Sequence, residues 1–191
     1  MAHADSLPNF VLDGIAQQLG QFLPRLAKPP SPGAQGIELC ESFALWRLGR
    51  DSLAASAQTG DDLSQLAKPT GRWHHQLKVD GQATMFARST QSDAASYVVR
   101  AVSVSPLAER IDQAIDWVDQ NIQARLLARL LVVPAYGVHA FWLVGDGEGD
   151  DQVLVIDAPP QFTYLQPLGL FNSRAFLEAL LREPQVIGID Q

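Results

Sequence analysis

The chain has very little cysteine: Cys40 is its only thiol among 191 residues. One cysteine cannot form a disulfide within the chain, and it cannot supply the several thiolates of a structural zinc cluster. Chemistry at sulfur is therefore limited to a single thiol and its neighbouring side chains. The scarcity of cysteine agrees with a reducing compartment, and we expect a cytoplasmic location.

Long apolar runs and an excess of basic residues are also missing. No apolar stretch approaches the roughly 20 residues that a membrane-spanning helix needs, and the start, MAHADSLPNF, lacks the basic and apolar regions of a signal peptide. The 14 Lys and Arg residues stand against 21 Asp and Glu residues, which gives a net charge of −7. Because acidic surfaces repel phosphates and anionic lipids, we expect neither nucleic acid nor a membrane as a general partner.

Apolar residues are plentiful, since 47% of the chain is hydrophobic and only 18% is charged. This composition supports a substantial core and excludes wholesale disorder. The length predicts one domain of ordinary size with an added helical segment. We expect residues 1–30 to form an N-terminal helix and a proline-rich tether, and residues 31–191 to form a single α+β domain.

The N-terminal segment 8–27 predicts an amphipathic helix, because apolar residues recur there at helical spacing. These residues are Val11, Ile15, Leu19 and Phe22. Such a stripe packs either on the protein's own core, which is the more common case, or on a partner. Under the second alternative, the candidate binding residues are Phe10, Ile15, Leu19 and Phe22.

The middle of the chain changes to strand patterns. Asp80 and Gly81 stand between two extended runs, which is typical of a β-hairpin turn. Apolar and polar residues alternate along 73–79, and this alternation predicts a sheet with one face in water. Later runs are apolar on both faces and predict inner strands, at 130–135, 139–145 and 152–157.

Two helices have clear starting signals. Ser105 and Pro106 suit the cap and the first position of a helix that continues to Ile122, and Asn172 or Ser173 suits the cap of a last helix. Strands punctuated by single helices favour the α+β class. We therefore predict a mostly antiparallel sheet of about six strands with helices on one face, plus the N-terminal amphipathic helix.

Metal and cofactor sites have little support. The turn from Asp146 to Asp151 contains four acidic side chains, but Asp157 stands where a calcium-binding EF-hand loop needs its glutamate. His74 and His75 are neighbours on an expected strand, so their side chains point to opposite faces. We expect no metal and no cofactor; whether the acidic turn binds a cation stays open.

One set of side chains suits nucleophilic catalysis. A thiol hydrolase needs a thiolate, a histidine that holds the proton, and a group that orients the imidazole. Cys40 stands near the start of a segment with helical spacing, where a helix N-terminus would lower the thiol pKa. His139 begins one expected strand and Asp157 ends the next, so a hairpin would bring them to the same end. Gln35 would donate to an oxyanion.

In order and spacing, these residues resemble papain-like cysteine peptidases of the bacteriocin-processing transporter type. In that family a glutamine precedes the cysteine, and a strand led by histidine is followed by a strand ending in Asp-Pro. The resemblance implies acyl transfer with Cys40 as nucleophile, His139 as base and Asp157 as the orienting group. This chain departs from the pattern at Ala158, which separates the aspartate from Pro159, and in the residues around the cysteine.

Binding without catalysis is the other class of function. Glu38 and Glu41 flank Cys40 and would raise the pKa of its thiol rather than lower it. The order of elements also resembles type III secretion chaperones, which are small and acidic. We favour a non-catalytic adaptor or chaperone-like protein that binds another protein or a peptide. The sequence leaves homo-oligomerisation open.

Overall fold

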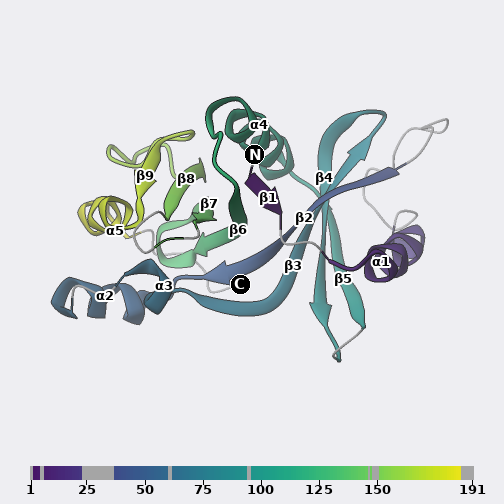
Figure 1. Cartoon of the computed structure of the whole chain (residues 1–191), viewed down its shortest axis with the longest axis horizontal. Coiled ribbons are helices and arrows are strands. Elements are labelled where there is room, and N and C mark those ends of the chain that lie inside the picture. Colours follow the sequence, from purple (N-terminus) through teal and green to yellow (C-terminus); the bar gives the residue numbers. More distant parts are fainter. Residues whose placement is uncertain are drawn as a thin grey trace. The chain divides into compact units, whose positions relative to one another are not determined.

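The computed structural model describes residues 2–4, 7–22, 37–59, 62–93, 96–145, 147 and 151–185, which form an α+β fold (Figure 1). The five helices are α1 (Asn9–Phe22), α2 (Arg50–Thr59), α3 (Leu63–Leu66), α4 (Pro106–Asn121) and α5 (Ser173–Arg182). The strands are β1 (Ala2–Ala4), β2 (Ile37–Arg47), β3 (Lys68–Val79), β4 (Gln82–Gln91), β5 (Tyr97–Val104), β6 (Leu126–Val133), β7 (Val138–Val144), β8 (Gln152–Asp157) and β9 (Leu170–Asn172). A short 3-10 helix, η2 (Pro134–Tyr136), joins β6 to β7.

The strands form one mixed sheet. Eight of them follow the order β5-β4-β3-β2-β6-β7-β8-β9, and β1 pairs with β6. The pairing of β2 with β6 is parallel, whereas β3–β4, β4–β5, β6–β7, β7–β8 and β8–β9 are antiparallel. The predicted α+β class with a mostly antiparallel sheet is confirmed. The expected number of about six strands was too low, because β2 has helical spacing in its sequence and β9 is only three residues long.

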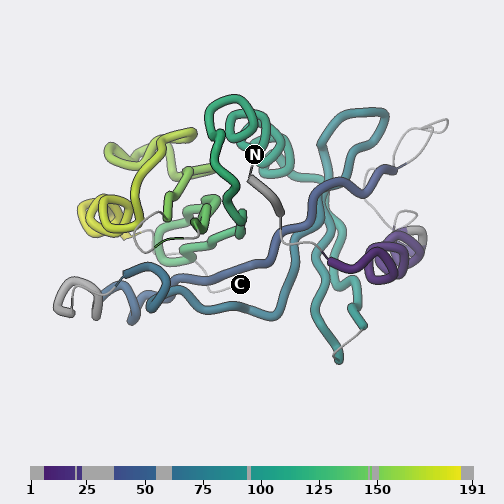
Figure 2. Tube along the Cα trace, in the orientation of Figure 1, coloured from purple at the N-terminus to yellow at the C-terminus, as the bar shows by residue number. Residues whose placement is uncertain are grey.

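The chain divides into two compact units. The α1 unit comprises Ala4–Ala44 and Gly71–Ile115, and the α5 unit comprises Met1–His3, Leu45–Thr70 and Asp116–Gln191. The continuous trace in Figure 2 shows β2, β3 and α4, each of which contributes residues to both units. The predicted boundary between residues 30 and 31 lies outside the described residues.

In the α1 unit, helix α1 packs on one face of the sheet. Its apolar stripe joins a buried cluster with Leu77 of β3, Met85 of β4 and Val99 of β5. Ile15 is completely buried and Leu19 is 4% exposed. The structure therefore places these two candidate binding residues in the protein's own core.

The opposite face of this sheet is covered as well. His74 and Gln76 are both 0% exposed, and Gln76 Nε2 donates a hydrogen bond to the backbone oxygen of Ala108 in α4. Lys78 forms an ion pair of 3.1 Å with Asp112 of the same helix. The expectations of one face in water and of helices on one face only are wrong for this unit. The polar residues that suggested a wet face instead pair with groups on α4.

Helix α1 also closes the edge of the sheet at β5. Gln18 Nε2 donates to the backbone oxygen of Tyr97 at 3.0 Å, and Gln18 Oε1 accepts from the backbone nitrogen of Val99 at 2.9 Å. β5 is the last strand in the order of the sheet, and backbone groups two residues apart lie along the same edge of a strand. The carboxamide thus makes the hydrogen bonds that another strand would make, and it protects this edge from strand addition.

In the α5 unit, strands β6, β7 and β8 carry buried side chains on both faces, as their apolar runs predicted. One cluster joins them to α2, α3 and α5 through residues such as Trp142, Val155 and Phe176. The predicted cap at Asn172 is confirmed, because its side chain accepts from the backbone nitrogen of Ala175 at the start of α5. Asp62 caps α3 in a similar way, since it accepts from the backbone nitrogen of Leu63. In the α1 unit, the Asp80-Gly81 turn joins β3 to β4 with both residues at positive φ.

We predict that Ile15→Ala lowers the free energy of unfolding by about 2–5 kcal/mol, because it removes a fully buried side chain from close-packed contacts. Phe10 lies on the same helix and is 62% exposed, so Phe10→Ala should change the stability by less than about 0.5 kcal/mol. Urea denaturation followed by tryptophan fluorescence measures both. Equal, small effects of the two substitutions would show that α1 does not pack on this core.

Candidate functional site

The residues predicted for nucleophilic catalysis belong to both units: Cys40 to the α1 unit, and His139 and Asp157 to the α5 unit. His139 lies near the start of β7 and is the register partner of Asp157 at the end of β8. The two residues therefore stand opposite each other, as the hairpin pattern predicted. Gln35, the predicted oxyanion donor, lies outside the described residues.

Cys40 lies inside strand β2 and not at the start of a helix. A strand supplies no N-terminal dipole to stabilise a thiolate. Burial, and then the negative charges of Glu41 and Glu38, raise the pKa of the Cys40 thiol to about 11. The sulfur is consequently almost fully protonated at neutral pH, which is unfavourable for a nucleophile.

A buried histidine links three strands of the α1 unit. His75 Nδ1 lies 2.8 Å from Ser42 Oγ, and His75 Nε2 lies 2.7 Å from Ser89 Oγ. Burial lowers the pKa of His75 to about 4, so the neutral ring offers one donor and one acceptor to the two hydroxyls. All three side chains are at most 6% exposed. This hydrogen-bonded chain therefore holds β2, β3 and β4 together and is out of reach of a substrate.

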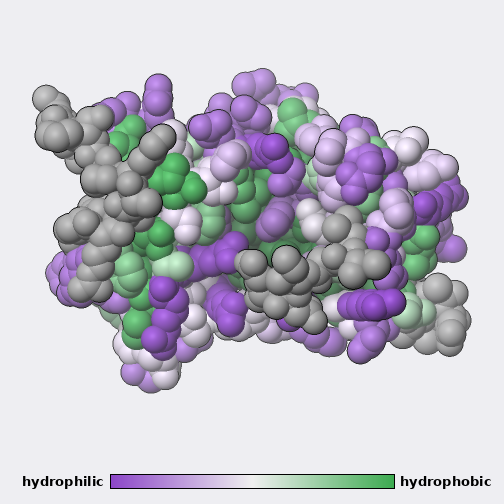
Figure 3. Space-filling view, turned by 180° about the vertical axis from the view of Figure 1, so that it is seen from behind, coloured by the Kyte–Doolittle hydropathy of each residue, from purple (hydrophilic) through white to green (hydrophobic). Residues whose placement is uncertain are grey.

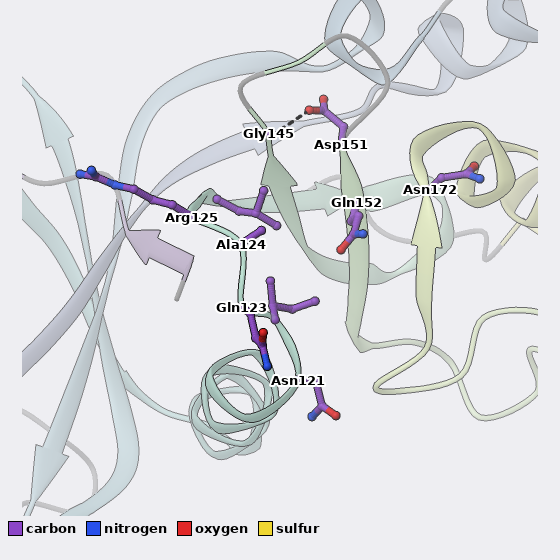
Figure 4. A pocket seen from close by; sticks show the side chains of 10 residues that line it. Asn121, Gln123, Ala124, Arg125, Gly145, Asp151, Gln152 and Asn172 are labelled. Atoms are coloured by element: carbon purple, nitrogen blue, oxygen red, sulfur yellow. Dashed lines mark hydrogen bonds between the residues drawn. The ribbon is translucent and has the colours of Figure 1, made fainter.

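The described residues of the α5 unit border a pocket of about 640 Å³ (Figure 4). It lies between the end of α4, the connection from α4 to β6, and neighbouring ends of β7, β8 and β9. Its volume falls in the range of sites for small ligands or peptide side chains. Apolar lining comes from Ile122, Ala124 and Leu126, and the carboxamides that line it belong to Asn121, Gln123, Gln152 and Asn172.

The carboxamides of the pocket differ in their hydrogen bonding. Asn121 Nδ2 donates to the backbone oxygen of Trp117 at 2.8 Å, and Asn172 Oδ1 accepts from the backbone nitrogen of Ala175 at 2.8 Å. Gln152 Oε1 is buried and has no hydrogen-bond partner within the described part of the chain.

Asp151 fixes one wall of the pocket. One carboxylate oxygen accepts from Trp142 Nε1 at 2.8 Å, and the other accepts from the backbone nitrogen of Gly145 at 3.2 Å, the dashed line in Figure 4. These bonds tie the end of β7 to the start of β8. Of the acidic turn, Asp146, Glu148 and Asp150 lie outside the described residues.

Trp142 packs against a second indole, and one guanidinium lies over both rings. The Arg129 guanidinium lies 4.4 Å from the ring centre of Trp46 and 4.8 Å from that of Trp142, and the indoles meet edge to face at 5.2 Å. Cation–π contacts of this kind contribute about 0.5–2 kcal/mol each. Arg129 and Trp46 thus hold the Trp142 ring in place, and the indole nitrogen of Trp142 donates to Asp151 in the pocket wall.

Sequence reasoning did not predict this pocket. Its lining residues come from separate segments that only the fold brings together, and no local motif marks them. The one available signal is Gln152, a polar residue at the head of the apolar run VLVI. A uniform apolar strand would not place a carboxamide there.

Comparison with known proteins finds no match: no protein-family model, no curated protein and no solved structure is significantly similar to this chain. Over the described ranges, no three or more His, Cys, Asp or Glu side chains are grouped so that they could hold a metal ion. The described helices include none that is long and apolar enough to cross a membrane.

Iodoacetamide should alkylate native Cys40 slowly. Raising the thiol pKa from 9.0 to about 11 lowers the thiolate fraction at neutral pH about a hundredfold. We expect native Cys40 to react more slowly than free cysteine by roughly this factor. In urea, the unfolded chain should react at nearly the rate of free cysteine. Native alkylation as fast as that of the unfolded chain would contradict the raised pKa and favour the thiol hydrolase alternative.

The His75 ring should stay neutral at pH values where an exposed histidine is protonated. Its pKa of about 4 lies below the roughly 6.5 of an unfolded chain, so the unfolded state binds the proton first as the pH falls. The stability that the neutral ring contributes is complete above about pH 6.5 and is lost as the pH falls to about 4. Proton NMR of the ring follows this titration, and a midpoint near that of free histidine would refute it.

Proposed function

We propose that the protein is a non-catalytic, chaperone-like adaptor that binds another protein or a peptide. The observation that carries the proposal is the chemistry of the pocket wall. Its described lining residues offer amide donors and acceptors beside apolar side chains, and no serine, threonine, cysteine, histidine, lysine or tyrosine is among them. Such a wall suits hydrogen bonding to a ligand better than it suits nucleophilic or acid–base chemistry.

The charged side chains at the pocket support the same interpretation. A carboxylate is a common general base, but both oxygens of Asp151 already accept hydrogen bonds from the protein. Arg125 is exposed and extends away from the pocket in Figure 4. Neither group is placed to move a proton on a bound molecule.

Exposed apolar side chains offer further binding energy. Phe10 is 62% exposed, and in the α5 unit Tyr164, Leu168, Leu170 and Leu181 are 38–49% exposed. Seen from the side drawn in Figure 3, most of the surface is hydrophilic and hydrophobic side chains appear in separate spots. Each exposed side chain contributes about 25 cal/mol for every Å² of apolar surface that a partner buries.

Phe22 is half-buried against the core of its unit, so Phe10 is the most accessible of the four predicted binding residues.

The alternative function is a papain-like thiol hydrolase. The register that sets His139 opposite Asp157 favours it, because a base needs an orienting group. The protonated thiol of Cys40 speaks against it. We therefore keep binding as the proposed function.

The full chain should select binding sequences from a random peptide library displayed on phage. We expect synthetic copies to bind with dissociation constants of about micromolar magnitude. Ala124→Trp puts an indole into the pocket, so it should weaken binding about tenfold or more. Fluorescence anisotropy of labelled peptides measures the affinities.

Ala54→Trp is the matched control for this substitution. Ala54 is also exposed in the α5 unit, but it lies on α2 and does not line the pocket. Its replacement should leave the affinity unchanged. Failure to enrich any binding sequence would contradict the proposed function, and equal affinities of the two variants would contradict the role of the pocket.

A further inference from the structure

Among the described residues, two arginines keep a buried Nε without a hydrogen-bond partner, and they are Arg88 on β4 and Arg129 on β6. Arg129 lies over the rings of Trp46 and Trp142, whose electron-rich faces attract its charge. Arg88 lies over a single ring, that of Phe86, with its guanidinium carbon 5.1 Å from the ring centre. No carboxylate within the described part of the chain forms an ion pair with Arg88. Its charge is therefore the less compensated of the two.

A second guanidinium lies on the same face of the sheet as Arg88. In the antiparallel pair of β3 and β4, His74 is the register partner of Arg88, and Arg72 is the register partner of Thr90. Side chains two residues apart on a strand share a face, so all four of these side chains point to one side. Burial and the neighbouring positive charge of Arg72 lower the pKa of the Arg88 guanidinium. Both causes disfavour the charged form, and an anion bound beside it would offset them.

The protein holds the Arg88 guanidinium in place and leaves part of it open. The rings of Phe86 and His74 stack with their centres 4.7 Å apart, and both side chains are at most 6% exposed. This pair gives the guanidinium a fixed surface to lie on. Arg88 is only partly buried, and its two terminal nitrogens are not among its buried unpaired atoms. A ligand would therefore reach the terminal nitrogens and not Nε.

A carboxylate is the anion that fits these groups best. The two terminal N–H groups of an arginine match the two oxygens of a carboxylate. Thr90 is partly buried and lies two residues from Arg88 on β4, so its hydroxyl is placed to donate to the same ligand. The chain has a net charge of −7, and its repulsion grows with the negative charge of the ligand. A singly charged carboxylate is thus favoured over a doubly charged phosphate.

We propose that Arg88, together with Thr90 and Arg72, binds the carboxylate of an acidic side chain in a bound peptide. The peptide as carrier of the carboxylate rests on the proposed function, whereas the carboxylate chemistry rests on the α1 unit alone. Arg88 forms a bidentate pair with the two carboxylate oxygens, Thr90 donates from its hydroxyl, and the exposed Arg72 adds positive charge. None of these three residues lines the pocket of the α5 unit, so substitutions here leave the lining of that pocket unchanged.

Two matched peptides test the role of the carboxylate. Acetyl-alanyl-glutamyl-alanine amide carries one negative charge, and acetyl-alanyl-glutaminyl-alanine amide has nearly the same shape and no charge. In NMR spectra of the full chain at constant ionic strength, millimolar amounts of the glutamyl peptide should shift the Nε–H signal of Arg88 and the amide signals of β4. The glutaminyl peptide should leave these signals in place. Equal shifts with both peptides, or no shift with the glutamyl peptide, would overturn the proposal.

Two simple anions identify the group that is recognised and its source. Acetate should shift the same signals only at higher concentrations than the glutamyl peptide, because the peptide adds contacts around its carboxylate. Acetate that binds as tightly as the peptide would support the carboxylate chemistry and overturn the peptide as its carrier. Inorganic phosphate at pH 7.5 should bind more weakly than acetate. Tighter binding of phosphate would overturn the assignment to a carboxylate.

Substitutions separate the site from the overall charge of the chain. Arg88→Gln removes the pairing guanidinium and should weaken binding of the glutamyl peptide about tenfold or more. Arg72→Gln changes an exposed side chain, so it should keep the fold and weaken binding about two- to threefold through the lost charge. Arg50→Gln is the matched control, because Arg50 is exposed on α2 of the α5 unit and its loss changes the net charge equally.

The control substitution should leave the affinity unchanged, and the urea midpoint of each variant shows whether it is folded. Equal effects of Arg88→Gln and Arg50→Gln would refute the site. An unchanged affinity of Arg72→Gln would refute it as well, and this variant tests the site even if Arg88→Gln does not fold.

Failure of this inference differs from failure of the proposed function. If peptides from the library bind and neither Arg88→Gln nor Arg72→Gln weakens those that contain an acidic residue, the binding function stands and this site is wrong. If the library yields no binding sequence but the glutamyl peptide shifts the Arg88 signal in a charge-dependent way, the site stands and the adaptor role is wrong.

Discussion

The need to pair buried polar groups governs this structure. A buried donor or acceptor without a partner costs free energy of the same size as a hydrogen bond. Gln76 meets the need through the backbone of α4, and His75 meets it through two serine hydroxyls. At the edge of the sheet, the side-chain amide of Gln18 forms hydrogen bonds with the backbone of Tyr97 and Val99 in β5. These bonds determine which faces of the strands are covered.

The pocket wall of the α5 unit follows the same rule. Asp151 accepts hydrogen bonds from both Trp142 Nε1 and the backbone nitrogen of Gly145, and the Arg129 guanidinium lies over the Trp142 ring. These contacts hold the end of β7 and the start of β8 together beside the pocket.

Local signals predicted the local features of the fold. The cap at Asn172 and the Asp80-Gly81 turn depend on a few neighbouring residues, and the sequence identified both. The inner strands followed from their apolar runs. The pairing of His139 with Asp157 followed from strand lengths alone, because a hairpin brings its two ends together. Strand lengths do not predict whether this pair takes part in catalysis, because that also depends on the pKa of the Cys40 thiol, which burial raises.

Features that depend on distant parts of the chain were missed. β2 has apolar residues at spacings that suit a helix, and only its pairing with β6 makes it a strand. The alternation around His74 indicated water on one face, but alternation cannot distinguish water from a polar contact with α4. The pocket has no motif, because its residues meet only after β7, β8 and β9 assemble.

A crystal structure of the full chain tests the central claim most directly. The account predicts that Gln76 Nε2 donates to the backbone oxygen of Ala108 in α4, and that the His75 ring bonds to the hydroxyls of Ser42 and Ser89. Polar side chains of β3 that face water instead of α4 would contradict it.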